Sequence, residues 1–276
     1  MARTTPLLYE RLTWPEVERA VGEDRVCLIP AGTLEDHGPH LPIDTDVRIA
    51  TEVCRRAAER APDEVILLPP IVHGFTPHHM DFPGPITLGW ETFVRSCADI
   101  GSSLARHGFT RILFLNGHGS NVPLLDVAAR LIGLEHPDVL AASAFYLQSE
   151  EGMKVVEQVR ESPRGGMGHA CELETSIYLA IDPDAVDMER AVDESSFPAG
   201  PNCWMDWTDG PLRLMPWWSA ISETGVHGAP TLATAEKGRL LLEAAVEECV
   251  AYVRELRGKP LPARRRPRER PGGGAG

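Results

Sequence analysis

The stretch from Glu35 to Asp46 (EDHGPHLPIDTD) concentrates side chains that can bind metal ions. Its carboxylates and imidazoles are Glu35, Asp36, His37, His40, Asp44 and Asp46. Such groups are the usual protein ligands of Zn, Mn and Fe, and the apolar strand before them would hold them rigidly. The pattern Glu-x-His followed nine residues later by Asp therefore predicts one half of a metal site.

Further histidines follow later segments of the chain. His118 stands between Gly117 and Gly119, which let the backbone turn tightly so that the imidazole can point into a cavity. His79 follows a second apolar segment, and His169 follows a glycine-rich run. Each motif alone also fits a surface loop or a helix cap, so the prediction depends on their combination.

Apolar periodicity predicts the elements that carry these residues. Strands are expected at 25–30, 65–68, 111–115 and 139–144, and helices at 13–21, 46–59, 90–106, 122–134, 170–181 and 234–257. Strands that alternate with helices predict an α/β fold, a three-layer αβα sandwich with a mostly parallel sheet. Because sites in such sheets gather at the carboxyl ends of the strands, the polar motifs should meet there.

Composition bounds the domain organisation. A chain of 276 residues with 43% apolar side chains can bury a large core, and we expect a single domain over residues 1–258. Residues 259–276 are rich in Pro, Gly and Arg and should form a disordered basic tail. The tail could dock on an anionic partner or have no role at all.

Charge and cysteine usage narrow the classes of function. The formal net charge is −13, and without the six basic and one acidic side chains of residues 259–276 it is −18, which disfavours nucleic-acid binding. No apolar run approaches the ~18 residues of a membrane span, and the first residues lack the apolar stretch of a signal peptide, so a cytoplasmic protein is expected. Six cysteines without C-x-x-C spacing predict reduced, mostly buried thiols.

Taken together, the motifs resemble the creatininase (creatinine amidohydrolase) family over residues 8 to 257. The resemblance is carried by EDHGPHLP at 35–42 with Thr45-Asp46, by NGHGSN at 116–121 and by HACELETS at 169–176. It implies two divalent metals, with Glu35 and His118 on one, His37 on the other, and Asp46 bridging both. Such a pair would share a water, lower its pKa and polarise the scissile carbonyl. Zn is favoured, with Mn or Fe as alternatives.

The chain departs from creatininase at Ser120, where creatininase has a metal-binding glutamate. Glu172 and Glu174 are the candidates to replace that ligand. If residues 170–181 are helical, Glu172 lies on the same face as His169 and Glu174 lies well round the helix. We therefore expect Glu172 on the second metal and Glu174 in a supporting or helix-anchoring role. Either glutamate could instead be favoured by the helix dipole alone.

The resemblance also assigns supporting roles. His169 matches the catalytic histidine, which would relay a proton from water to the leaving nitrogen, although a histidine at a helix start can also be a simple cap. Residues expected to orient the ligands or contact substrate are Asp36, His40, Asp44, Asn116, Ser120, Asn121 and His79. His79 should line the entrance to the site, in this or an adjacent subunit. The tryptophans between 204 and 218 could pack, contact a neighbouring subunit or form a substrate wall.

The function that follows is a metal-dependent amidohydrolase that cleaves a C–N bond in a small amide, lactam or formamide. Creatinine itself is disfavoured, because the tryptophan that creatininase places before its catalytic histidine is missing from Pro163–Met167. One alternative keeps the metals but cleaves a peptide, or a C–C bond in an oxidised inositol. Another is a metal-stabilised assembly subunit without turnover. The resemblance further implies a homo-oligomer, a hexamer.

Overall fold

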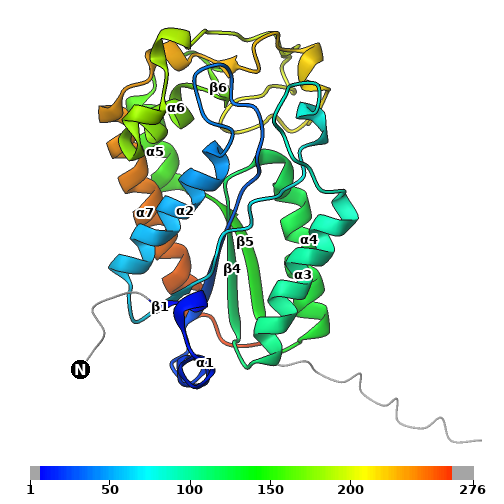
Figure 1. Ribbon diagram of the computed structural model, residues 1–276, viewed down its shortest axis with the longest axis vertical. Helices are drawn as coiled ribbons and strands as arrows, with labels where there is room; N and C mark the ends of the chain where they lie inside the picture. The colour runs from blue at the N-terminus through cyan, green and yellow to red at the C-terminus, as the bar shows by residue number, and fades with distance from the viewer. Residues whose placement is uncertain (1–6, 263–276) are drawn as a thin grey trace, which may run out of the picture.

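A computed structural model describes residues 7–262 and contains a five-stranded parallel sheet (Figure 1). The strands are β1 (Leu7–Leu8), β2 (Val26–Ala31), β3 (Val65–Leu67), β4 (Arg111–Asn116) and β5 (Leu140–Phe145). They are ordered β1-β3-β2-β4-β5, and every neighbouring pair is parallel. The carboxyl ends of the strands point to the top of Figure 1.

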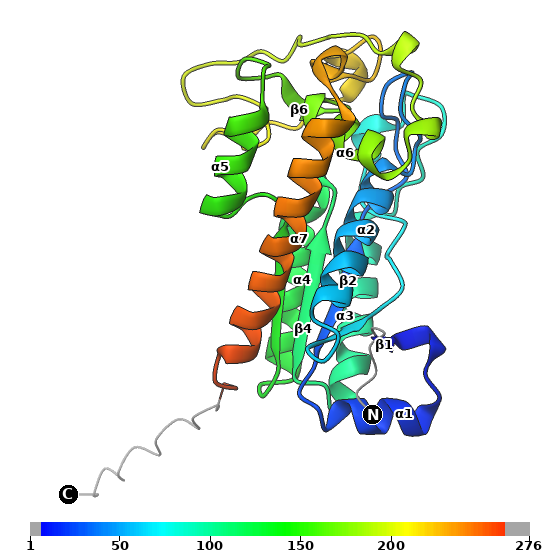
Figure 2. The ribbon, with the colours of Figure 1, turned by 90° about the vertical axis from the view of Figure 1, so that its left-hand side faces the viewer.

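Helices cover both faces of this sheet. They are α1 (Trp14–Val21), α2 (Thr45–Arg60), α3 (Trp90–Arg106), α4 (Val122–Glu135), α5 (Glu150–Val159), α6 (Glu172–Ile181) and α7 (Ala235–Gly258). In Figure 2, α2 and α7 lie in front of the sheet and α3 and α4 lie behind it. The predicted three-layer αβα sandwich is therefore confirmed.

The central strand β2 shows why the sheet needs both layers. Val26 and Leu28 belong to a core cluster with residues of α2 and α7, whereas Cys27 and Ile29 belong to a cluster with residues of α3 and α4. Successive side chains of a strand point to opposite faces, and all six residues of β2 are buried. The continuous apolar run in the sequence is typical of such a doubly covered strand.

Most predicted elements occur within a few residues of their expected bounds. A capping box of Thr13 and Glu16 opens α1, and α3 has the predicted bounds. The sequence did not predict the short strand β1 or the antiparallel pair β6 (Met167–His169) and β7 (His227–Gly228). As a result His169 lies in a strand, and the helix expected from residue 170 begins at Glu172.

Several expectations from composition can also be compared with the structure. All six cysteines are free and buried, as predicted. Among residues 7–262, none of the helices combines the length and apolar character that crossing a bilayer requires. Residues 263–276 of the predicted basic tail lie outside the residues that the structure describes.

Candidate metal centre

The first group of possible metal ligands joins three elements at the carboxyl ends of the strands. Glu35 lies in the loop after β2, Asp46 lies in the first turn of α2, and His118 follows β4. The Nδ1 atom of His118 lies 3.1 Å from Oε1 of Glu35 and 3.1 Å from Oδ2 of Asp46. One ligand atom from each side chain can therefore surround a single ion.

The second group consists of His37, His169 and Glu174. Nε2 of His37 lies 3.8 Å from Oε1 of Glu174 and 3.3 Å from Oδ1 of Asp46. Asp46 thus presents one carboxylate oxygen to each group. This is the geometry that a carboxylate bridging two ions requires.

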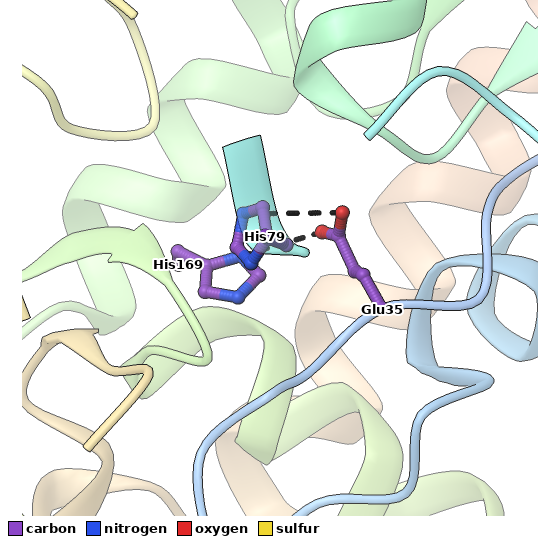
Figure 3. A group of neighbouring side chains, drawn as sticks. All are labelled: Glu35, His79 and His169. Carbon is purple, nitrogen blue, oxygen red and sulfur yellow. Dashed lines mark ion pairs between the residues drawn. The ribbon is translucent and has the colours of Figure 1, made fainter. Parts of the chain in front are cut away.

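A third arrangement of ligands overlaps the first two. Glu35, His79 and His169 come from three different segments, and Figure 3 shows their side chains directed toward one another. Nε2 of His79 lies 3.9 Å from Oε2 of Glu35, and Nδ1 of His169 lies 3.6 Å from Oε1 of Glu35. Glu35 therefore has histidines near both of its oxygens.

Hydrogen bonds to the backbone orient three of these imidazoles. Nε2 of His118 donates to the carbonyl of Phe75 at 3.1 Å, and Nε2 of His169 donates to the carbonyl of Asp36 at 2.8 Å. Nδ1 of His37 faces the carbonyl of Glu35 at 3.4 Å. Because the nitrogen near the carbonyl carries a proton, the other nitrogen of each ring faces the cluster, where it can bind a cation in its unprotonated form.

Buried atoms without hydrogen-bond partners show that the cluster suits cations. Nε2 of His37 and Oδ2 of Asp46 are buried and make no hydrogen bond in the described part of the chain. The carboxylates of Glu35, Asp46 and Glu174 are likewise buried, and within residues 7–262 no lysine or arginine pairs with them. Buried charges of this kind are paired or bind metal, so the donor set fits divalent ions.

The electrostatics of the site reflect these opposing charges. Burial raises the pKa of Glu35, but His118 and His79 outweigh burial and hold this pKa well below its usual range. Burial lowers the pKa of His118, but Glu35 and Asp46 outweigh it and raise the value to about 10. Burial, together with His37 and His79, lowers the pKa of His169 to about 4, so its imidazole is neutral.

Contrary to the expectation that it binds the second metal, Glu172 is in none of the three ligand groups and its carboxylate has other partners. Its carboxylate accepts hydrogen bonds from the backbone amides of Glu161 and Ser162, both at 2.9 Å, and pairs with Nζ of Lys237 at 2.5 Å. The argument from helical spacing failed because His169 precedes the helix. Ala170, with φ of +48°, turns the chain between them, so that Glu174 faces His37 instead.

Most residues expected to orient the ligands do contact the site or its supports. Asp36 pairs through Oδ1 with Nδ1 of His79 at 2.6 Å, and the backbone amide of His118 donates to Oδ1 of Asn116 at 3.1 Å. Oδ1 of Asn121 accepts from the backbone amide of Phe75 at 2.9 Å, which holds the loop that receives His118.

Other predicted supporting residues contact α6 or the cavity instead. Nε2 of His40 lies 2.9 Å from Oγ1 of Thr175, and the Tyr178 hydroxyl donates to Asp44 at 2.9 Å. These two contacts join the loop after β2 to α6. Ser120, at the position of the missing glutamate, lies 3.3 Å from Nε2 of His78.

A cavity of about 490 Å³ opens above the cluster. Glu35, His118 and Glu174 line one part of it, and the irregular segment from Met205 to Trp218 forms much of the remaining wall. The Trp218 ring stacks on His79, with ring centroids 4.5 Å apart and an interplanar angle of 22°. The sequence offered no way to choose this tryptophan among its neighbours, because the segment has no periodicity.

Comparison with known proteins places the chain among related sequences. The sequence model of the creatininase family, described as creatinine amidohydrolase, matches residues 10–253. A mycofactocin precursor peptide peptidase of Mycobacterium tuberculosis is 34% identical, covering 84% of this chain and 86% of that protein. The creatinine amidohydrolase of Pseudomonas putida is 32% identical, covering 88% and 95%. A 3-dehydro-scyllo-inosose hydrolase of Thermotoga maritima is 27% identical, covering 93% and 85%.

Solved structures agree with the sequence comparison. A tryptophan-to-phenylalanine mutant of creatininase has a TM-score of 0.79 at 29% identity, covering 92% of this chain and 100% of its own. A Zn-Zn form and an Mn form of creatininase have TM-scores of 0.76 and 0.77, each at 27% identity and with the same coverage.

The three-layer αβα fold, the carboxylate–imidazole centre and the named relatives together indicate a hydrolase with a candidate centre for divalent metals. Within that class, the chain belongs to the creatininase family. The resemblance and the enzyme class predicted from the sequence are thereby confirmed, and the donor set is one that binds divalent metals.

Proposed function

We propose that the protein binds two divalent metals per chain, Zn before Mn or Fe, and hydrolyses a C–N bond in a small amide, lactam or formamide. The observation that carries this proposal is the position of Asp46, whose two oxygens face His37 at 3.3 Å and His118 at 3.1 Å. In the proposed ligand set, Glu35 and His118 would hold one ion, His37 and Glu174 would hold the other, and Asp46 would contribute one oxygen to each.

Hydrolysis of a C–N bond sets clear demands on the protein. Oxygen from water bonds to the carbonyl carbon, the C–N bond breaks, and the nitrogen takes up a proton. When bound, the metals lower the pKa of the attacking water and polarise the carbonyl. His169 is suited to move the proton, because Nε2 is held by the Asp36 carbonyl and leaves Nδ1 as an acceptor facing the site.

Peptide cleavage is a second candidate within the same chemistry. A relative that is 34% identical carries the name of a precursor peptide peptidase. Leu214 and Met215 at the wall of the cavity are half-exposed, so this wall could contact an extended substrate outside the cavity. A peptide bond is also a C–N bond, so the roles of the metals and of His169 would not change.

A panel of substrates tests the proposal. Metal-reconstituted protein should hydrolyse at least one of a set of formamides, lactams and short peptides, and chelation should abolish this turnover. Elemental analysis should find close to two metals per chain. A protein that binds one metal or none would contradict the proposal. A metal-loaded protein that is inert toward the whole panel would also contradict it and would favour a metal-stabilised assembly subunit.

The same proposal includes the cellular location, the oligomeric state and the partners of the enzyme. We expect a cytoplasmic homo-oligomer, a hexamer, acting on a small-molecule substrate. The buried free cysteines are consistent with a reducing compartment. The acidic body disfavours binding to nucleic acid.

A further inference from the structure

Strand β5 lies at an edge of the sheet, and its outer side has no partner in the described part of the chain. It pairs only with β4, and all six of its residues are half-buried. The Leu140 amide donates to the carbonyl of Thr110, beside β4, at 2.9 Å. Because successive backbone groups point to opposite sides of a strand, the N–H and C=O groups of Ala141, Ser143 and Phe145 point outward.

A groove of about 430 Å³ runs beside this edge. Residues 142–144 of β5 are Ala, Ser and Ala, whose side chains are too small to fill the space between the two helical layers. The groove is lined on one side by Val122 and Leu125 of α4 and on the other by Tyr252 and Leu256 of α7. It therefore lies beside β5 and between the two helical layers, where a further strand of the sheet would lie.

The groove continues into the metal cavity. Val122, Phe145 and Gln148 line both of them. Since β5 is parallel to β4 and ends at Phe145, a chain lying along β5 would be led toward the carboxyl ends of the strands, where the ligand cluster lies. The edge and the reaction site thus form one continuous surface.

The chemistry of the edge selects the class of ligand. Natural edge strands are usually protected by charged residues, by proline or by a covering element. The sequence of β5, LAASAF, contains neither a charged residue nor a proline. A row of free N–H and C=O groups is satisfied by an extended backbone. A second copy of this chain could also supply one, but the lining that the groove shares with the metal cavity favours the backbone of a substrate.

We propose that the β5 edge binds the extended backbone of a peptide substrate as an added strand and directs its scissile C–N bond into the metal cavity. This inference rests on the proposed hydrolysis of C–N bonds and names peptides as the substrate class. The small residues of β5 make room for side chains on both faces of the added strand.

A proline at an outward position tests the inference. Ser143→Pro removes one outward N–H but no hydrogen bond to β4, and proline is tolerated at strand edges. Ser143→Ala keeps the N–H and is the matched control. Binding of a labelled ten-residue peptide of alternating valine and threonine to the metal-loaded protein is measured by fluorescence anisotropy. Ser143→Pro should weaken binding about 5-fold, the effect of one lost hydrogen bond, while Ser143→Ala should bind as the unmodified protein does.

Further measurements control for misfolding of the variant and for binding of a second copy at the edge. Ala141→Pro replaces Ser143→Pro if thermal unfolding shows that the latter does not fold. Equal binding by the proline and alanine variants would overturn the inference, and so would a proline variant that dissociates from an oligomer to a monomer, because a second copy would then occupy the edge. If the unmodified enzyme hydrolyses small amides but binds no peptide, the inference fails while the proposed function stands.

Discussion

Replacing Glu174 by glutamine should remove one of two bound metals, whereas replacing Glu172 by glutamine should remove neither. Glu174 faces His37 across 3.8 Å and has no lysine or arginine partner in the described chain, so its charge is available to an ion. Glu172 is only 1% exposed and is committed to Lys237 and to two backbone amides. The two variants make the same chemical change two residues apart.

The expected cost of Glu172→Gln is one of stability. Removing one charge of a buried ion pair costs at most about 3 kcal/mol here, because Lys237 keeps its ion pair with Glu161 at 2.7 Å and its hydrogen bond to the Leu232 carbonyl at 2.8 Å. For a domain of this size, each kcal/mol lowers Tm by about 2–4 °C, so a fall of no more than about 6–12 °C is expected. Glu174→Gln should also lower the stability of the metal-free protein, because His37 outweighs burial and holds the pKa of Glu174 at about 2, so the fold stabilises this carboxylate.

Elemental analysis of the purified variants, together with thermal unfolding, measures both effects. The expected result is about one metal per chain for Glu174→Gln and about two for Glu172→Gln. The assignment is refuted if Glu172→Gln loses a metal while Glu174→Gln keeps both. Calorimetry of the two metal-free variants separates loss of a ligand from loss of fold.

Three other outcomes are expected. Asp46→Asn should lower the metal content toward zero together with turnover; retention of two metals with unchanged turnover would remove Asp46 from the bridging role. His169→Ala should keep its metals but lose about 100-fold or more in kcat, in line with the loss of a general acid–base group, and metal loss instead would make His169 a ligand. Gel filtration should give about six times the chain mass of 30.2 kDa, and a monomer would contradict the expected hexamer.

Local patterns in the sequence were enough to predict the layers of the fold. Strand β2 could be recognised because all its side chains are buried, and α3 because its apolar residues recur at helical spacing. These patterns depend on which face of an element meets the core, and that information is contained in neighbouring residues. The clustering of Glu35, Asp46 and His118 followed from the rule that sites form where parallel strands end.

Contacts between distant segments could not be predicted in this way. The choice between Glu172 and Glu174 depends on the turn at Ala170 and on Lys237, which reaches Glu172 from α7. Trp218 meets His79 from a segment without periodicity, and the open edge of β5 becomes visible only once the strand order is known. Side-chain periodicity indicates which face of an element is buried, but it does not indicate which distant residue contacts that face. These features therefore required the three-dimensional structure.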